Sequence, residues 1–463
     1  MSLRSGKVKE MTEEPNTSAF TGDDRKSSSP LKLPAISGVF DDGQILEIVY
    51  RPKERETAFV LWNDDKWTLE KSYKVNEGHH LVPYSPYNNL IKNEVVLLPS
   101  NPEEYESEES LVSDIQTFIH RYVDVSPLFE KIATYYVLFS WIYDGFNELP
   151  YLKLRGDFGS GKTRFLLTVG SLCYKPIFAS GASSVSPLFR ILDVFRGTLI
   201  IDEADFRLSD ERAEIVKILN NGNVKGFPVL RSEMVGKEFN PRAYHVFGPK
   251  IVATRGFFED RALESRFLAE EMGRYRLRDD IPINLPSAYK EEALHIRNKL
   301  LLFRFRNLNK RKIVEDLVDR SIEPRLNQIF VPLLSIIKDA QAREELRQLA
   351  RQYNREMIAE RGIEVAAQVL EIVREMASPH KKRLSVGDIT SRFIDLYGED
   401  YEHKVTTRWI GNIIRKKLNL KTHKSHGVYV ISHVAKAQLE HLYEKYGISP
   451  NHDQELTTEK TSP

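Results

Sequence analysis

Gly156-Asp157-Phe158-Gly159-Ser160-Gly161-Lys162-Thr163 gives this chain its strongest structural signal. The stretch follows the pattern G-x-x-x-x-G-K-[ST], which is typical of a phosphate-binding loop. Glycines let the backbone curl so that successive N–H groups point at phosphate oxygens. Lys162 is predicted to reach the β- and γ-phosphates, and the Thr163 hydroxyl is predicted to hold Mg²⁺. The predicted nucleotide-binding residues of the loop are Gly156, Gly159, Ser160, Gly161, Lys162 and Thr163.

The residues around the loop fit this interpretation. Tyr151–Leu154 predicts a strand before it, and Arg164–Leu167 opens a predicted helix after it. A helix that starts at the loop presents its positive N-terminus to the same anions. The sequence therefore predicts a strand, a phosphate loop and a helix in that order.

An acidic motif follows forty positions after Lys162, where Leu199-Ile200-Ile201 is followed by Asp202 and Glu203. The apolar part predicts a buried parallel strand. Asp202 at its carboxyl end is predicted to bind Mg²⁺, together with Thr163, and Glu203 to polarise the attacking water. The predicted cofactors are ATP and Mg²⁺.

The composition sets limits on the whole chain. Its 463 residues are 41% hydrophobic, which is enough for several packed domains, and its formal net charge is only +1. Any nucleic-acid surface must therefore come from local clustering of basic residues. Cys173 is the single cysteine, so neither a disulfide framework within the chain nor a cysteine zinc site is possible. No apolar run approaches the ~20 residues of a membrane span, and the start lacks the apolar core of a signal peptide. We expect a soluble, cytoplasmic protein without a membrane partner.

The first hundred residues divide into two segments of different composition. Residues 1–34 are polar and are expected to be disordered, because nothing there can bury a core. Residues 35–100 contain the β-prone runs Ile45–Tyr50 and Thr57–Trp62, and they predict a small β-rich domain. Its aromatic side chains can form either the core of that domain or a surface on which bases stack.

A linker and two helices precede the phosphate loop. Residues 101–109 carry glutamate at five of nine positions and are expected to be solvated and extended. Helical patterns follow over Leu111–Tyr122 and Pro127–Tyr143. The second pattern is apolar on every face, which predicts a helix buried beside the sheet.

A predicted β-hairpin follows the acidic motif. Phe227–Arg231 and Ala243–Phe247 flank the polar segment Ser232–Arg242, which holds Lys237 near its middle. Lys237 is either a solvated surface lysine or a lysine that grips a nucleic-acid backbone. Pro249–Thr254 then predicts another buried strand.

Taken together, these motifs resemble an AAA+ ATPase. They are the phosphate loop, the Asp-Glu pair, the polar residue that ends the next strand, and Leu263-Glu264-Ser265-Arg266. The hairpin before that strand resembles the pre-sensor insertion of the AAA+ helicase branch, which includes the minichromosome-maintenance helicases and viral or plasmid replication helicases. The resemblance covers about residues 127–340. The chain is also similar to uncharacterised ATPases carried by mobile genetic elements.

The resemblance implies an α/β fold with a parallel sheet and a helical lid, and it implies roles for further residues. Thr254 matches sensor 1, which is usually Asn in the family. Arg266 matches the arginine finger that reaches the neighbouring subunit's site, with Arg261 as the second candidate. Both arginines can also be surface residues paired with nearby acids. Arg325 near a lid-helix start is the sensor 2 candidate, expected to touch the γ-phosphate from above.

The C-terminal part predicts a separate DNA-facing unit. Helices over Val386–Tyr397 and Thr406–Leu418 and a strand over Val428–Ile431 resemble a winged helix. From Lys404 to His426 there are seven Lys or Arg residues and no acid, so we expect a surface that binds DNA. A solvated basic face or a protein-contact module remains the alternative. The predicted DNA-binding residues here are Thr407, Arg408, Asn412, Arg415, Lys416, Lys417, Lys421 and Lys424.

The expected organisation therefore has seven parts. They are a disordered tail (1–34), a β-rich N-terminal domain (35–100), an acidic linker and helix (101–126), an AAA+ ATPase core (127–285), a helical lid and connector (286–378), a winged helix (379–446) and a second disordered tail (447–463).

Three functions fit these expectations. The first is an ATP-dependent DNA helicase or translocase in the replication of a mobile element, working as a hexameric ring. Single-stranded DNA would then lie in the pore, with Lys237 on it, and double-stranded DNA on the winged helix. The second is an origin-binding initiator or helicase loader that does not unwind DNA. The third is a DNA-binding regulator switched by nucleotide.

Overall fold

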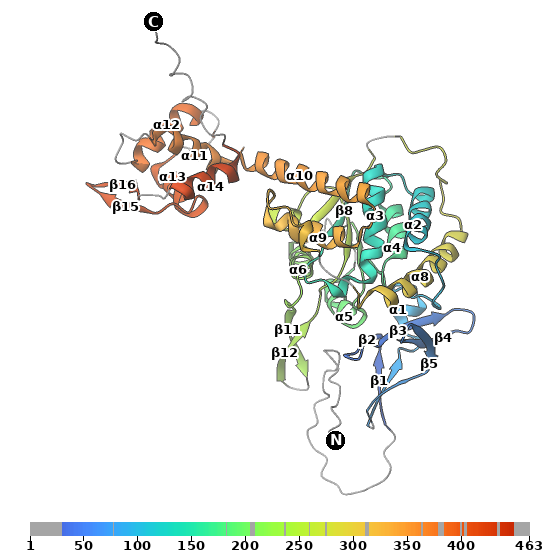
Figure 1. The fold of residues 1–463 in the computed structure, drawn as a ribbon. Coiled ribbons are helices and arrows are strands. Elements are labelled where there is room, and N and C mark those ends of the chain that lie inside the picture. Colours follow the sequence, from blue (N-terminus) through green and yellow to red (C-terminus); the bar gives the residue numbers. More distant parts are fainter. Residues whose placement is uncertain are drawn as a thin grey trace. The chain divides into compact units, whose positions relative to one another are not determined.

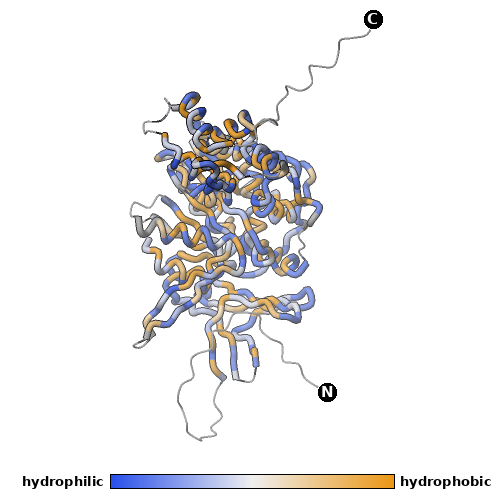
Figure 2. The backbone as a smooth tube through the Cα atoms, turned by 90° about the vertical axis from the view of Figure 1, so that its left-hand side faces the viewer, coloured by the Kyte–Doolittle hydropathy of each residue, from blue (hydrophilic) through white to orange (hydrophobic). Residues whose placement is uncertain are grey.

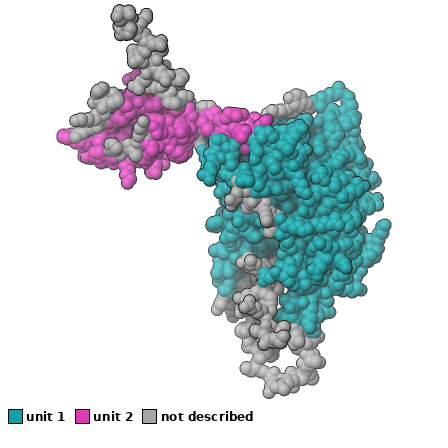
Figure 3. Space-filling view, viewed as in Figure 1, with its two compact units in different colours: residues 1–347 teal, residues 348–463 magenta. Residues whose placement is uncertain are grey.

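The computed structural model divides the chain into two compact units, residues 1–347 and 348–463, which are coloured teal and magenta in Figure 3. The described residues are 30–76, 78–181, 183–203, 209–235, 238–258, 260–273, 276–310, 314–362, 364–377, 384–398, 401, 405–432 and 436–448. The two units are described separately below.

A five-stranded parallel sheet organises the first unit (Figure 1). Its order is β14 (Phe267–Glu271), β8 (Tyr151–Arg155), β13 (Lys250–Thr254), β10 (Leu199–Asp202) and β9 (Ile177–Ser180). Neighbouring strands pair in parallel throughout. The strands predicted around the phosphate loop, the acidic motif and Thr254 are confirmed, and so is the α/β fold.

Helices cover both faces of this sheet. The strand residues alternate between the faces: Tyr151 and Lys153 bond to α6 (Ser209–Asn221) and α7 (Arg261–Glu264). On the opposite face α4 (Lys162–Leu172) packs so closely on β10 that a Cβ at Gly170 would lie 2.3 Å from Ile200 Cδ1. Apolar segments run through the middle of these layers (Figure 2). The layer on the α4 side also contains α2 (Glu108–Tyr122), α3 (Pro127–Trp141), α8 (Ala288–Asn307) and α9 (Pro324–Ile336), while α5 (Val185–Phe195) packs on α6.

The N-terminal residues form two small sheets. One has the order β2 (Ser37–Val39), β3 (Ile45–Arg51), β4 (Glu56–Asn63), β5 (Lys66–Glu70), and the other β1 (Leu31–Ala35), β7 (His79–Pro83), β6 (Tyr73–Asn76). The predicted tail through residue 34 is therefore too long, because β1 pairs in parallel with β7. Phe59 and Trp62 are buried, and Trp62 stacks on Phe305 of α8. These two aromatics form core.

A buried ionic cluster binds this β-rich part to the central layers. Glu47 of β3 accepts hydrogen bonds from Arg304 Nε of α8 at 2.7 Å and from the Tyr174 hydroxyl at 2.7 Å, and it pairs with Lys175 Nζ at 2.8 Å. Arg304 also makes a bidentate pair with Asp144 at 2.9 and 2.7 Å. Glu47, Lys175 and Arg304 are each 1% exposed, and burial lowers the pKa of Lys175 to about 8. Two cations and two carboxylates thus share one site, which is buried except at Asp144, whose side chain is 30% exposed.

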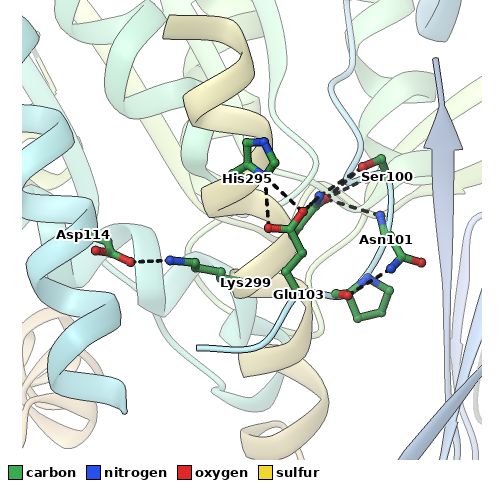
Figure 4. A network of polar contacts seen from close by, with 8 residues as sticks. Ser100, Asn101, Glu103, Asp114, His295 and Lys299 are labelled. Atoms are coloured by element: carbon green, nitrogen blue, oxygen red, sulfur yellow. Dashed lines mark hydrogen bonds and ion pairs between the residues drawn. The ribbon is translucent and has the colours of Figure 1, made fainter. Parts of the chain in front are cut away.

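The acidic linker is docked on α8, although Glu104, Glu106 and Glu109 are exposed, as the sequence predicted. Figure 4 shows Ser100, Asn101 and Glu103 of this segment beside α8. Asn298 Oδ1 accepts from the Ser100 amide at 2.9 Å, and Asn298 Nδ2 donates to Glu103 at 2.7 Å. His295 lies 3.1 Å from the same carboxylate, and Lys299 pairs with Asp114 of α2 at 2.7 Å. Partner groups on α8 therefore fix a segment that its composition alone predicted to be free.

The segment predicted as a helical lid and connector (286–378) does not form one separate part of the structure. α8 is not a peripheral lid, since its inner face, including Leu300 and Leu301, is fully buried among α2, α3 and α4. The second unit starts at Gln348, within α10 (Ala340–Gly362), and thus earlier than residue 379.

The second unit is a small helical core with a hairpin. It contains α11 (Val365–Met376), α12 (Val386–Tyr397), α13 (Thr407–Asn412) continued by a helical turn (Ile413–Lys417), β15 (Thr422–Ser425), β16 (Val428–Ile431) and α14 (Lys436–Tyr446). α11 packs into this core with Ile389, Phe393 and Ile410, although the sequence placed it in the connector. Ile448 joins the same core, so the predicted tail from 447 also begins too early.

Across the described ranges, no helix is both long and apolar enough to cross a membrane.

Candidate nucleotide site and DNA-facing surfaces

The predicted phosphate loop joins β8 to α4. Gly159 and Gly161 adopt φ angles of 77° and 92°, a left-handed conformation that a side chain would disfavour. Lys162 Nζ donates to the carbonyl oxygens of Gly156 and Asp157 at 2.6 and 2.7 Å and lies 3.3 Å from Ser160 Oγ. The ammonium is thus held inside the curve of the loop by oxygen acceptors.

The acidic motif meets this loop directly. The Thr163 hydroxyl donates to Asp202 Oδ2 at 2.6 Å, and the two residues come from the start of α4 and the end of β10. A hydroxyl and a carboxylate are the hard oxygen ligands that Mg²⁺ prefers. The two predicted metal ligands are therefore adjacent, and their chemistry fits the ion.

Glu203 is set in an unusual backbone conformation at the edge of the same site. Its φ is 52°, its amide donates to Asp202 Oδ1 at 2.9 Å, and its side chain is exposed. A Cβ on Gly181 would lie 2.4 Å from the carbonyl oxygen of Glu203. Because Gly181 has no side chain, the backbone of Glu203 can lie this close to it.

This contact yields a prediction. Gly181→Ala is expected to displace Glu203 and to lower kcat for ATP hydrolysis about 10²-fold, because small misplacements of catalytic groups have effects of that size. ATP affinity, measured by fluorescent-analogue titration, is expected to change little. Gly256→Ala is the matched control, since a Cβ there meets nothing within 4 Å. Equal kcat values for the two variants would contradict the prediction.

Thr254 ends β13 between the two motifs. β13 pairs with β8 on one side and with β10 on the other, so Thr254 lies opposite Arg155, one residue before the loop. The Thr254 hydroxyl donates to the Gly256 carbonyl at 2.8 Å, and the residue is 2% exposed. The sensor 1 candidate is therefore at the expected edge, but its hydroxyl is bonded within its own loop.

Arg266 and Arg325 lie at the other end of the sheet. The Arg266 guanidinium bonds to Asn220 of α6, and Arg325 donates to the Ala262 carbonyl in α7. Burial and the neighbouring charge of Arg325 lower the pKa of Arg266, and burial lowers the pKa of Arg325. Arg266 Nε is buried without a hydrogen-bond partner in the described structure. Two guanidinium groups thus gather near one carboxylate, Asp260, which also bonds to Asn220.

The strand geometry separates these arginines from the loop of their own subunit. The Tyr151 amide donates to the Arg266 carbonyl at 3.0 Å, so Arg266 lies beside the first residue of β8. Along that strand, Tyr151 is five residues before Gly156. Five strand residues span about 16 Å, much more than an arginine side chain reaches. Arg325 lies beside Arg266 and is therefore separated from the loop of its own chain in the same way. Arg261, the second finger candidate, is exposed at the start of α7.

The predicted hairpin forms from β11 (Val229–Val235) and β12 (Glu238–Tyr244), and it extends away from the sheet (Figure 1). Glu233 anchors it by pairing with Arg190 of α5 at 2.8 Å. Leu230, Met234 and Phe239 are 69%, 67% and 72% exposed and share one face of the ribbon. Lys237, the predicted phosphate grip, lies outside the described residues.

The basic stretch of the second unit falls on α13 and the hairpin after it. The exposed members of the predicted set are Thr407, Arg408, Arg415, Lys416, Lys417, Lys421 and Lys424. Arg415 donates to Asn412 Oδ1 at 3.0 Å and lies 3.3 Å from the Thr422 hydroxyl, so it links the helix to β15. Lys404 lies outside the described residues. The described cations gather on two adjacent elements, as the sequence predicted.

Sequence reasoning missed three residues of this region. Asn220 holds Arg266, and Lys153 and Glu264 form an ion pair at 2.5 Å between β8 and α7. Only Lys153 carried a signal, because a lysine inside the apolar run Tyr-Leu-Lys-Leu must find a partner when buried.

Comparisons with known proteins find distant likenesses among solved structures. No family model and no curated protein matches the chain. Among solved structures, the C-terminal region of NrS-1 is 12% identical with a TM-score of 0.35, covering 84% of this chain and 96% of that one. A full-length MCM homolog from Methanopyrus kandleri is 11% identical with a TM-score of 0.37, covering 69% and 75%. The Aeropyrum pernix ORC1 protein in complex with DNA is 16% identical with a TM-score of 0.23, covering 72% and 96%. At these identities no residue's role can be transferred from those structures to this chain, and each proposed role rests on this chain's own geometry.

Proposed function

We propose that this chain is a cytoplasmic ATP-dependent DNA helicase or translocase that works in the replication of a mobile genetic element. The observation that carries the proposal is that two sets of candidate catalytic residues lie at opposite ends of the sheet. Lys162, Thr163, Asp202 and Glu203 gather at one end of the sheet, and Arg266 lies at the other end. A second copy of the chain is therefore required to bring both halves to one ATP.

The chain's own residues have distinct tasks in this site. Lys162 exchanges its carbonyl partners for β- and γ-phosphate oxygens, and the amides at the start of α4 bind the same anion. Thr163 and Asp202 would hold Mg²⁺, which neutralises charge on the phosphates. Glu203 accepts a proton from the attacking water and orients it.

The neighbouring subunit supplies the positive charge. Arg266, together with Arg325 beside it, is proposed to contact the γ-phosphate across the interface and to stabilise the charge on the transferred group. Both guanidinium groups are half-buried, and burial together with the charge of Arg325 lowers the pKa of Arg266, so an incoming anion stabilises the charged form of Arg266. Repetition of this head-to-tail contact closes a ring, for which we propose six subunits.

Two surfaces are proposed to hold DNA. The β11–β12 hairpin carries exposed Phe239 and Met234, which can stack on bases of a single strand in the pore, with Lys237 on the phosphates. The basic face of α13 and β15 is proposed to act as a winged helix on double-stranded DNA. Hydrolysis would then move the hairpin along the strand.

The test of the whole proposal is unwinding of a forked duplex with ATP, measured with the ATPase rate in the presence and absence of single-stranded DNA. Strand separation that disappears in Glu203→Gln supports a motor. DNA-stimulated hydrolysis without separation points to an origin-binding initiator or loader instead. Hydrolysis that DNA does not affect would leave the nucleotide-switched regulator.

A separate prediction concerns the second unit. Lys416→Ala with Lys417→Ala is expected to weaken binding to duplex DNA and to reduce the slope of log K against log salt by about 1 for each lost phosphate contact. Arg392→Ala is the control, because Arg392 already pairs with Glu375 at 2.8 Å. Fluorescence anisotropy at several salt concentrations measures both. An unchanged slope in the lysine variant would remove the helical turn Ile413–Lys417, which follows α13, from the DNA interface.

A further inference from the structure

One carboxylate in the first unit makes contacts that have no part in the proposed nucleotide site or DNA surfaces. Glu264, the last residue of α7, accepts a hydrogen bond from Lys153 Nζ at 2.5 Å and another from the Phe258 amide at 2.5 Å. Lys153 lies in the middle of β8 and is 1% exposed. The lysine is therefore a buried cation whose carboxylate partner also fixes a loop.

Aromatic rings close the site around this ion pair. Lys153 Nζ lies 5.3, 4.9 and 5.8 Å from the ring centroids of Phe257, Phe258 and Phe267. Phe258 and Phe267 are buried and attract the ammonium, whereas Phe257 is 71% exposed and the Glu264 side chain is 22% exposed, so the ammonium is the part of the ion pair that is shielded from water. A charge in such a place is costly without its partner. The position of Glu264 is thus determined more strictly than that of a surface carboxylate.

The three segments that meet here belong to different parts of the proposed site. Lys153 lies on the strand that leads into the phosphate loop, and Phe258 lies four residues after Thr254. Phe257 also contacts that strand, because the Arg155 guanidinium lies 3.9 Å from its ring centroid. Glu264 is two residues before Arg266. One carboxylate therefore connects the subunit's own nucleotide edge to its own arginine finger.

We propose that Glu264 is a positioning residue for Arg266 and that it links the finger to the nucleotide state of its own subunit. A shift of the loop after Thr254, when phosphate is bound or lost, moves the Phe258 amide. Glu264 follows that amide while remaining paired with Lys153, and α7 carries the change to Arg266. Since Arg266 acts in the next subunit's site, consecutive sites become coupled. This inference rests on the proposed function of Arg266.

A double-mutant cycle tests whether Glu264 acts through Arg266. Glu264→Gln is expected to lower kcat about 10- to 100-fold, as a small displacement of a catalytic group does, with the Kd for ATP unchanged. In the Arg266→Ala background, the same substitution is expected to lower kcat no further. The Hill coefficient for ATP is expected to fall toward one in Glu264→Gln. Glu345→Gln is the matched control, since this partly exposed carboxylate pairs with Lys131 at 2.6 Å, outside the contacts of the site.

The outcomes separate this inference from the proposed function. If Glu264→Gln lowers kcat by the same factor in both backgrounds, or leaves it unchanged, Glu264 does not position the finger. If Arg266→Ala itself leaves kcat unchanged, the shared site is wrong. Should Glu264→Gln fail to fold, Lys153→Met with Glu264→Gln removes the unpaired buried charge, and the same non-additivity is expected of it.

Discussion

Arg266→Ala is expected to lower kcat for ATP hydrolysis by about 10³-fold or more, the range measured for arginines that complete a phosphoryl-transfer site. The Kd for ATP is expected to change much less, because the loop and Lys162 belong to the other subunit of the pair. The physical reason is the location of Arg266 at the start of β14, about 16 Å of strand away from Gly156 of its own chain. Steady-state ATPase assays and nucleotide titration measure the two quantities.

Mixing two inactive variants distinguishes action in the neighbour from action in the same subunit. Arg266→Ala retains Glu203, and Glu203→Gln retains Arg266, so a mixed oligomer contains some interfaces with neither defect. With random assembly in equal amounts, about a quarter of the interfaces are intact. The ATPase activity is therefore expected to return to about a quarter of that of the unmodified protein. An absence of recovery in oligomers that are shown to mix would place the arginine outside the shared site.

The control is an arginine on the same unit that lies away from the proposed interface. Arg121 pairs with Glu292 at 2.8 Å and is 51% exposed. Arg121→Ala is expected to leave kcat within about twofold, since exposed pairs contribute at most about 1 kcal/mol.

Glu47→Leu is expected to lower the free energy of unfolding of the first unit by about 3–5 kcal/mol. The substitution leaves Arg304 and Lys175 buried with only Asp144 to balance them. Denaturant unfolding followed by circular dichroism and tryptophan fluorescence measures the loss. Lys290→Met is the control, because its pair with Glu94 is about 60% exposed on both sides, and it is expected to cost less than about 1 kcal/mol.

The charge balance of the cluster makes a sharper test possible. Glu47→Leu combined with Lys175→Met removes one charge of each sign and leaves the bidentate Arg304–Asp144 pair intact. The double variant is therefore expected to be more stable than Glu47→Leu alone, because no buried charge lacks a counterion. A double variant that is less stable than the single one would show that packing, not charge, holds the cluster.

The local sequence predicted well the strands and the loop that carry the candidate nucleotide site. A phosphate loop and an Asp-Glu pair are continuous motifs, and their backbone conformations depend on residues within a few positions. The parallel sheet then brought Thr163 and Asp202 to 2.6 Å. Thr254 was also predicted at the right edge, because strands in such a sheet end together. The helix Val386–Tyr397 and the strand Val428–Ile431 have the predicted bounds for the same local reason.

Predictions that depended on partners distant in sequence succeeded less often. The acidic linker seemed solvated by composition, yet Asn298 and His295 bind it from almost 200 residues away. Leu31–Ala35 contains Pro34, which disfavours a strand, and the segment forms one because β7 offers its backbone. Arg325 was expected above the γ-phosphate, and the path of α9 places it beside Arg266.

The sequence by itself determined which motifs this chain contains: the phosphate-loop pattern with its candidate metal ligands, the basic C-terminal stretch, and charged residues inside apolar runs. Glu47, Lys153 and Arg304 each stand among apolar neighbours, and a charge that is buried with such neighbours needs a partner. Only the tertiary structure decided that Glu47 meets Arg304, that Lys153 meets Glu264, and that Arg266 faces away from its own loop. Pairing across a fold depends on how strands and helices are stacked in space, and a local pattern carries no information about the residue that comes to lie opposite.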